Sequence, residues 1–387
     1  MSGPRDHVRR WDIFCRVVDN YGDAGVAWRL ARQLAREHAL AVALYIDDRA
    51  ALMRIAPSGE RGVEVRDWRG PDGPWSVDPD CASVVIEAFG CGLPSAYLDA
   101  MQARSVQPRW INLEYLSAEA WVDEHHALAS AQAHRALTRH FYFPGFTPAS
   151  GGLLRERALF AERDAFAADT PQAAASRTAL WRALDVETPS RDAMAVSMFC
   201  YDNAGLPPLL STWADASLPI VCILPEGVGE ARIDAWAGVP TGAAGTSVER
   251  GSLRLSRARF VTQDAYDRLL WACHLNFVRG EDSFVRAQWA ARPLVWNVYP
   301  QDGQAHLRKL EAFAGRYAAA LPAAASEAYA AFCAAWNGND EVAAARAWPE
   351  LVSVLPLLQR QALSWSAHLG VQRDLASALV NFASTVV

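Results

Sequence analysis

The chain has 387 residues, of which 51% are apolar and 21% are charged, and its net charge is −6. This composition excludes a disordered chain, and the length exceeds one typical hydrophobic core, so we expect two domains. A surface that binds a phosphate backbone needs a basic stripe, so the acidic balance argues against a nucleic acid as the main partner.

The first half of the chain alternates short strand-like runs with helical ones. Strands are predicted at 12–18, 41–47, 63–67, 83–89, 109–115 and 140–143. Helices are predicted between several of them, notably at 24–37 and 94–103. This alternation is typical of a parallel sheet that helices cover on both faces. Strand character is lost over 165–192, where Ala, Thr and Pro accumulate, and we interpret this stretch as the interdomain connection.

The alternation restarts after this connection. Strands are predicted at 194–200, 219–224, 253–261, 275–279 and 294–298. Helices are predicted near 205–214, 263–272, 282–291 and 302–319, and the pattern beyond 325 is wholly helical. The fold class is therefore α/β, with two Rossmann-like domains, 1–185 and 186–365, that face each other across a cleft. Ligands of such sheets bind outside the carboxyl ends of the strands.

The cysteines and the apolar runs indicate in which cellular compartment the protein is expected. Seven cysteines form no C-x-x-C pair, and most lie in apolar runs such as "VSMFCY". Reduced, buried thiols of this kind predict a cytoplasmic protein. The first residues lack the apolar core of a signal peptide, and no apolar run approaches about 18 residues, so no membrane span is expected.

The segment "DNYGDAG" follows the first predicted strand. Gly22 and Gly25 permit a tight turn, but the spacing is not that of a dinucleotide loop, and the carboxylates of Asp19 and Asp23 would repel a phosphate. One interpretation makes Asp23 the helix N-cap and Asp19 a turn residue. The other makes them a general base or a cradle for a cationic acceptor, with Asn20 between them. The residues alone leave both open.

A second motif, "HLNFVRGEDSFVRAQWA", places Arg279 and Gly280 between a predicted strand and a helix. Arg279 offers a planar fork and the helix start offers free N–H groups, a combination that suits a diphosphate. The alternative is plain capping by Asp282 or Ser283, with Glu281 solvated.

Further motifs are less specific. Phe260 and Gln263 in "RFVTQDAY" could contact a nucleobase or simply belong to a core and a helix start, and Tyr201 in "SMFCYDNAG" could line a sugar pocket. The segment "DEHH" at 123–126 has metal-ligand residue types, but neither the H-E-x-x-H order nor zinc spacing occurs, so no metal is expected.

These segments, together with "FPGFTPASGGLLRE" and "ILPEG", resemble the bacterial arginine rhamnosyltransferases that modify elongation factor P. The resemblance runs from about Trp11 to the C-terminal helices. It implies a GT-B fold, in which the last helix, here about 366–387, crosses back to the first domain. It also implies dTDP-β-L-rhamnose as donor, an inverting reaction without metal or cofactor, and one arginine guanidinium of elongation factor P as acceptor.

The resemblance also implies roles for single residues. Asp23 matches the family's general base, Asp19 the other essential acid of that loop, and Glu281 the essential glutamate beside the donor. The diphosphate would be held at Arg279, Asp282 and Ser283, the thymine by Phe260 and Gln263, and another part of the donor by Tyr201, while Asp19, Asn20 and Asp23 would receive the acceptor. Tyr266 departs from the phenylalanine that is usual in the family.

Two other functions stay open on the sequence alone. The same scaffold serves nucleotide-sugar epimerases and glycosyltransferases that act on small molecules. A non-catalytic protein that binds the elongation factor is a further alternative, although a vestigial site has no need of three acids in its cleft.

Overall fold

The computed structural model describes residues 10–19, 21–73, 75, 82–300, 305–338 and 340–385. The chain divides into two compact units, one made of Met1–Arg157 with Gln372–Val387 and the other of Ala158–Val371. The first unit thus ends well before the expected boundary at 185. The reason is that helices α5 (Leu159–Ala167) and α6 (Pro171–Leu184) pack on helix α9 (Gln263–Ala272) of the second unit, so the stretch expected to be a connection is mostly helical.

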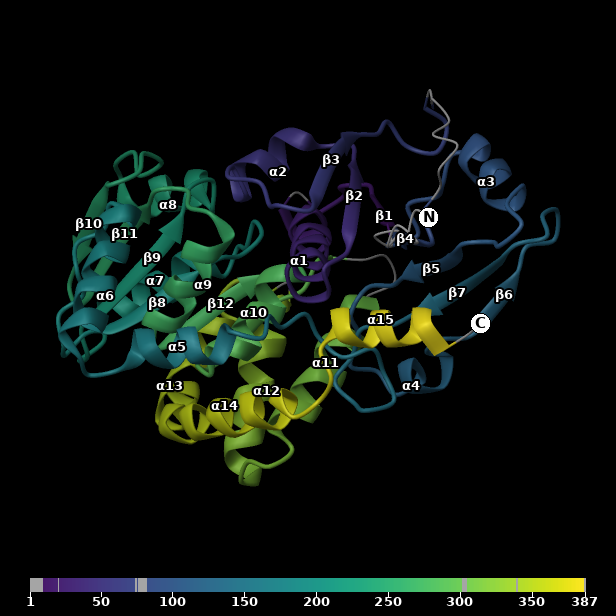
Figure 1. The fold of residues 1–387 in the computed structure, drawn as a ribbon. Helices are drawn as coiled ribbons and strands as arrows, with labels where there is room; N and C mark the ends of the chain where they lie inside the picture. The colour runs from purple at the N-terminus through teal and green to yellow at the C-terminus, as the bar shows by residue number, and fades with distance from the viewer. Residues whose placement is uncertain are drawn as a thin grey trace. The chain divides into compact units, whose positions relative to one another are not determined.

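The first unit is built on a seven-stranded sheet in the order β3-β2-β1-β4-β5-β7-β6 (Figure 1). Its strands are β1 (Arg10–Cys15), β2 (Ala41–Ile46), β3 (Val63–Asp67), β4 (Val84–Ala88), β5 (Arg109–Leu113), β6 (Ala129–Ala131) and β7 (Thr138–Tyr142). Its helices are α1 (Tyr21–His38), α2 (Arg49–Ile55), α3 (Ser95–Gln102), α4 (Trp121–His125) and α15 (Leu375–Thr385). The parallel strands confirm the predicted sheet, while the antiparallel edge strand β6 was not predicted.

An aromatic cluster fills the core of this unit on one face of the sheet. The Phe14 ring stacks on Tyr45 with ring centroids 4.4 Å apart, and Trp68 and Tyr97 meet Phe14 edge to face. All four side chains are almost completely buried. Because alternate residues of a strand point to opposite faces, this packing fixes which residues of β1 face each side of the sheet. It thereby fixes the register with which β1 ends at the carboxyl end of the sheet.

The second unit has a six-stranded sheet in the order β10-β11-β9-β8-β12-β13. Its strands are β8 (Met194–Met198), β9 (Ile220–Pro225), β10 (Ser247–Arg250), β11 (Leu253–Ala258), β12 (Leu275–Arg279) and β13 (Leu294–Asn297). Its remaining helices are α7 (Leu206–Ala214), α8 (Glu230–Ala237), α10 (Asp282–Ala290), α11 (Ala305–Ala318), α12 (Ala323–Asn337), α13 (Ala343–Ser353) and α14 (Leu355–Gly370). Five parallel strands match the prediction, and β10 is again an antiparallel edge strand that was not predicted.

The chain returns to the first unit through a break in the expected last helix. Helix α14 ends at Gly370, where a Cβ would lie 2.7 Å from the Phe160 ring, and α15 begins at Leu375. Asp374 starts this new helix, since its Oδ1 accepts the backbone N–H of Ser377 at 2.9 Å. The element that belongs to the first unit is therefore α15, and the expected start near 366 is wrong because 366–370 complete α14.

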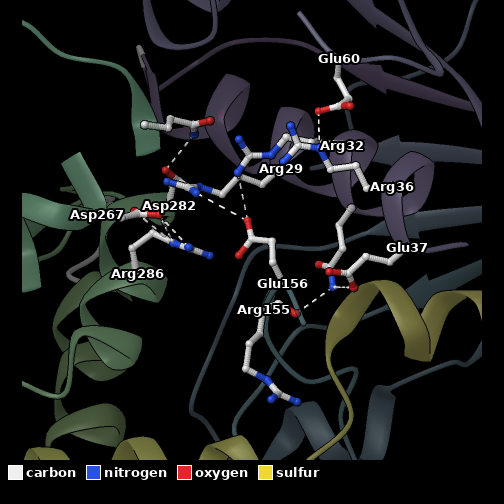
Figure 2. A network of polar contacts seen from close by, with 12 residues as sticks. Arg29, Arg32, Arg36, Glu37, Glu60, Arg155, Glu156, Asp267, Asp282 and Arg286 are labelled. Atoms are coloured by element: carbon white, nitrogen blue, oxygen red, sulfur yellow. Dashed lines mark hydrogen bonds and ion pairs between the residues drawn. The ribbon is translucent and has the colours of Figure 1, made fainter. Parts of the chain in front are cut away.

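Helix α1 carries a polar network within the first unit (Figure 2). Arg29 and Arg32 are buried and pair with Glu156 at 3.7 and 3.1 Å. Gln33, one turn after Arg29, donates to the carbonyl of Arg155 at 2.8 Å. Helix α1 is thereby fixed to the last residues before the boundary. No described helix is long and apolar enough to cross a membrane.

Candidate active site

The loop between β1 and α1 lies at the carboxyl end of the first sheet. It tightens through a hydrogen bond of 2.7 Å from the Gly22 N–H to the Asp19 carbonyl. A Cβ at position 22 would lie 2.9 Å from Asp19 Oδ2, so the glycine allows the Asp19 carboxylate to lie against the helix start. Asp19 is half-buried there. Asn20 lies outside the described residues, and its expected contact with the acceptor stays a prediction.

Asp23 is buried in the first turn of α1, with 1% of its surface exposed. Its Oδ2 accepts the backbone N–H groups of Val18 at 2.8 Å and Asp19 at 2.9 Å. The helix starts two residues earlier, at Tyr21, so the interpretation of Asp23 as the N-cap is wrong. The carboxylate instead reaches back over the loop and fixes the backbone that carries Asp19.

The surroundings of Asp23 raise the pKa of its carboxyl group. Burial is the main cause, and the nearby negative charge of Asp47 adds to it. The hydrogen bonds from the backbone of Asp19 and Val18 and from the Tyr115 side chain act in the opposite direction. A carboxylate with a raised pKa is a stronger base than an ordinary aspartate, which is the property that general base catalysis needs.

Two neighbours of Asp23 escaped the sequence analysis. Tyr115 follows β5, and its ring stacks on that of Phe89, which follows β4, with centroids 4.3 Å apart. Asp47 follows β2, and its Oδ1 accepts the Val17 N–H at 2.8 Å. Both stand at carboxyl ends of strands, and this position was the signal by which they could have been found.

In the second unit, the turn from β12 to α10 forms a compact backbone loop. Gly280 has a φ of +61°, a conformation that favours glycine. The Arg279 N–H donates to Ser283 Oγ at 3.2 Å, and the Ser283 hydroxyl donates back to the Arg279 carbonyl. Glu281 occupies the N-cap position without a side-chain capping bond, so capping by Asp282 or Ser283 is not what orders this loop.

The Arg279 guanidinium is held by residues that follow β8. Its Nη1 donates to the Cys200 carbonyl at 3.1 Å, and its Cζ lies over the rings of Phe199 at 4.3 Å and Tyr201 at 4.9 Å. The backbone N–H of Tyr201 is fixed in turn by Asn297 Oδ1 at 2.9 Å. The structure thus brings Arg279 and Tyr201 together. The positive charge of Arg279 lies beside the start of α10, and an anion binds favourably at such a position.

Helices α9 and α10 are joined by two pairs of side chains, one turn apart. Gln263 Nε2 donates to Asp282 Oδ2 at 3.0 Å, at the start of both helices. One turn further on each helix, Arg286 and Asp267 form a buried ion pair, with Nη2 to Oδ2 at 2.7 Å and Nε to Oδ1 at 3.1 Å (Figure 2). Sequence analysis missed this second pair, which fixes the spacing of the two helix starts.

Phe260 lies half-buried in the turn between β11 and α9, three residues before Gln263. Thr262 caps α9 through its side chain, which accepts from the Ala265 N–H. The predicted residues of the second half therefore gather at the carboxyl ends of β8, β11 and β12. Among the described residues, no three His, Cys, Asp or Glu side chains gather closely enough to hold a metal ion.

Comparison with known proteins identifies the family. The model of the family described as elongation factor P (EF-P) rhamnosyltransferase EarP matches residues 11–384. The chain belongs to this family of protein-arginine rhamnosyltransferases. A protein-arginine rhamnosyltransferase of Pseudomonas aeruginosa is 46% identical over 380 residues, which are 96% of this chain and 98% of that protein.

Solved structures agree with the family. One, described as the structural basis for EarP-mediated arginine glycosylation of translation elongation factor EF-P, is 35% identical with a TM-score of 0.70 and covers 98% of this chain and 99% of its own. The spinosyn rhamnosyltransferase SpnG shares the fold, with a TM-score of 0.51 at 11% identity over 96% of this chain and 99% of its own. The expected GT-B glycosyltransferase fold is thus confirmed.

Proposed function

We propose that this enzyme transfers L-rhamnose from dTDP-β-L-rhamnose to an arginine of elongation factor P, with inversion at the anomeric carbon. The observation that carries the proposal is the buried carboxylate of Asp23, which has a raised pKa and accepts the backbone N–H of Asp19 at 2.9 Å. In a family that modifies arginine, two carboxylates at a strand end suit a planar cation that forms paired hydrogen bonds.

The acceptor must lose a proton during the reaction. A guanidinium has a pKa above about 12, so an aspartate cannot deprotonate it beforehand. We assign Asp19 to orienting the guanidinium, with Asn20 beside it. Asp23 takes the proton as the nitrogen attacks the anomeric carbon and the bond to the diphosphate breaks. A base that is buried and already oriented by backbone N–H groups suits this late transfer.

The donor is assigned to the second unit. Arg279 and the backbone N–H groups of Asp282 and Ser283 meet the charge that develops on the departing diphosphate, in a reaction without metal. Phe260 stacks on the thymine and Gln263 contacts its edge. Tyr201 and Glu281 complete the donor side, Tyr201 through its contact with Arg279. In this assignment the first unit binds the acceptor and the second unit binds the donor.

Mass spectrometry of elongation factor P after incubation with the enzyme and dTDP-β-L-rhamnose tests the proposal. We expect a gain of one deoxyhexose on an arginine, and an α-linked product by NMR of the isolated peptide. An acceptor in which that arginine is replaced by lysine is the control and should gain nothing. Consumption of the donor without protein modification would instead support an epimerase or a small-molecule glycosyltransferase, and an inert donor would support a binding protein.

A further inference from the structure

Phe89 has a backbone conformation that bulky residues rarely adopt. Its φ is +58°, in the left-handed region, where a large side chain crowds the backbone. The other described non-glycine residues with a positive φ lie one or two residues after the end of a helix: Ala39, Ala127, Asp185 and Ala291. Left-handed residues are usual at helix ends. Phe89 instead follows the strand β4, so the end of a helix does not explain its strain.

Two buried polar side chains hold the turn after β4 in this conformation. Asn112 Oδ1 accepts the Gly90 N–H at 3.1 Å, and Glu87 Oε1 accepts the Gly92 N–H at 2.9 Å. Glu87 and Asn112 are register partners on β4 and β5, and each has 2% of its surface exposed. Burial of polar groups is costly, and these two offset the cost by hydrogen bonds to the turn. The surrounding structure thus maintains the strain at Phe89, and strain that is maintained in this way is often functional.

The turn places the Phe89 ring on that of Tyr115, which follows the neighbouring strand β5. The two rings are stacked, with centroids 4.3 Å apart and planes inclined by 14°, and both side chains are half-buried. The Tyr115 side chain is hydrogen-bonded to the carboxylate of Asp23. A tyrosine side chain has only two torsions, so a neighbour that fixes the plane of its ring also fixes the position of its hydroxyl.

From this geometry we infer that Phe89 is a positioning residue of the reaction, which keeps the Tyr115 hydroxyl directed at the carboxylate of Asp23. The inference rests on the proposed function, which makes Asp23 the general base. A base that is already held by oriented donors needs no reorganisation when it takes the proton. Phe89 acts only through Tyr115 in this role.

Loss of the Phe89 ring has a definite effect on the ionisation of Asp23. The groups that face this carboxyl group are Asp19 on the same loop, Cys15 at the end of β1, Asp47 after β2 and Tyr115 after β5. The Cys15 thiol stays neutral, since burial raises its pKa. The charge of Asp47 raises the pKa of Asp23, and the hydrogen bond from Tyr115 lowers it. A Tyr115 side chain that turns away therefore leaves Asp23 with a higher pKa.

Phe89→Leu tests the inference in the full-length enzyme, because leucine keeps an apolar side chain but removes the stacked ring. Rhamnose transfer to elongation factor P is measured as a function of pH. We expect kcat to fall about 10- to 100-fold and the acid limb of kcat/KM to move to higher pH. Affinity for dTDP, measured by calorimetry, should not change. Phe89→Tyr keeps a ring that can stack and should retain the normal rate and pH profile.

The double variant Phe89→Leu with Tyr115→Phe shows whether Phe89 acts through Tyr115. Once the hydroxyl is removed, loss of the Phe89 ring has no donor left to misplace. The acid limb of the double variant should therefore move no further than that of Tyr115→Phe alone.

Phe382→Leu is the matched control for a purely structural role. Phe382 is also a half-buried phenylalanine of the first unit that contacts a tyrosine ring, that of Tyr142, with centroids 5.4 Å apart. Its variant should lower the melting temperature and leave the acid limb in place.

Phe89→Gly and Phe89→Ala separate the strain from the function. Glycine adopts a positive φ without cost, so Phe89→Gly should melt at a higher temperature than Phe89→Ala, the reverse of the order at ordinary positions. Both variants lack the ring and should lose turnover equally. Phe89→Gly also replaces Phe89→Leu in the kinetic test if the leucine variant does not fold.

Two results would overturn the inference. Normal turnover with a normal acid limb in Phe89→Leu removes the residue from the positioning role, and additive shifts in the double variant separate it from Tyr115. In either case rhamnose transfer by the unchanged enzyme leaves the proposed function standing. Near-normal turnover in Asp23→Asn overturns the inference together with the assignment of the base, since no base is then left at this position to orient.

Discussion

Gln33 Nε2 donates to Asp374 Oδ1 at 2.9 Å, although the two residues are 341 positions apart in the sequence. The same Gln33 amide nitrogen also lies 2.8 Å from the Arg155 carbonyl, and Arg155 donates to the Gln372 carbonyl at 3.1 Å. Helix α1 is therefore bound to both stretches of chain next to the unit boundary. The buried face of α15 completes this attachment.

Leu379→Ala should destabilise the first unit by about 2–5 kcal/mol, the range for a truncated leucine in a core. Leu379 is completely buried on α15, so the substitution leaves a cavity beneath that helix. Urea denaturation measures the loss. Leu363→Ala on the neighbouring α14 is the control, because Leu363 is 53% exposed and should change stability very little. Equal effects in the two variants would contradict the assignment of α15 to the first unit.

Asp23→Asn should reduce turnover by about 10²–10⁴-fold if Asp23 is the general base. The asparagine oxygen can still accept the N–H groups of Val18 and Asp19, so the loop should persist. Burial raises the pKa of Asp23, which means that its charged form is disfavoured in the folded state, so stability at neutral pH should be equal or higher.

Single-turnover kinetics at saturating acceptor, with dTDP calorimetry as the control for the donor, distinguishes a chemical from a binding defect. Near-normal turnover would move the assignment of the base to Asp19 or Glu281.

Tyr115→Phe and Asp47→Asn should move the acid limb of the pH–rate profile in opposite directions. A base must be deprotonated, so kcat/KM falls as the pH drops through the pKa of Asp23. The Tyr115 hydrogen bond lowers that pKa and the Asp47 charge raises it. Loss of Tyr115 should therefore shift the limb to higher pH, and loss of the Asp47 charge to lower pH. Shifts of the same sign would show that another group is being titrated.

Arg286→Met should destabilise the second unit by about 3–5 kcal/mol, because it leaves Asp267 buried without its ion-pair partner. The double variant with Asp267→Leu should recover much of this loss, since both charges are then removed together. Thermal unfolding measures both. A double variant less stable than Arg286→Met would mean that Asp267 has a second stabilising role.

The sequence could predict the parallel strands because they are apolar runs, as "VVIEA" and "LNFVR" illustrate. It could not predict β6 and β10, since "ASA" and "SVER" are short and mostly polar, and each is ordered by an antiparallel partner at a sheet edge. Asp23 resembled an N-cap for a similar reason: its role depends on Tyr115 and Asp47, which only the sheet brings near it.

The return of the chain to its first unit has a consequence for the order of folding. The second unit is one continuous stretch, and its two ends lie together, since Phe160 lies against Gly370. The first unit needs α15, whose Leu375 N–H bonds to the Leu153 carbonyl, and the ribosome makes α15 after the entire second unit. Folding of the second unit replaces a long flexible loop by a fixed short span, which lowers the entropy lost when α15 docks. The unit synthesised first is thus the one that matures last.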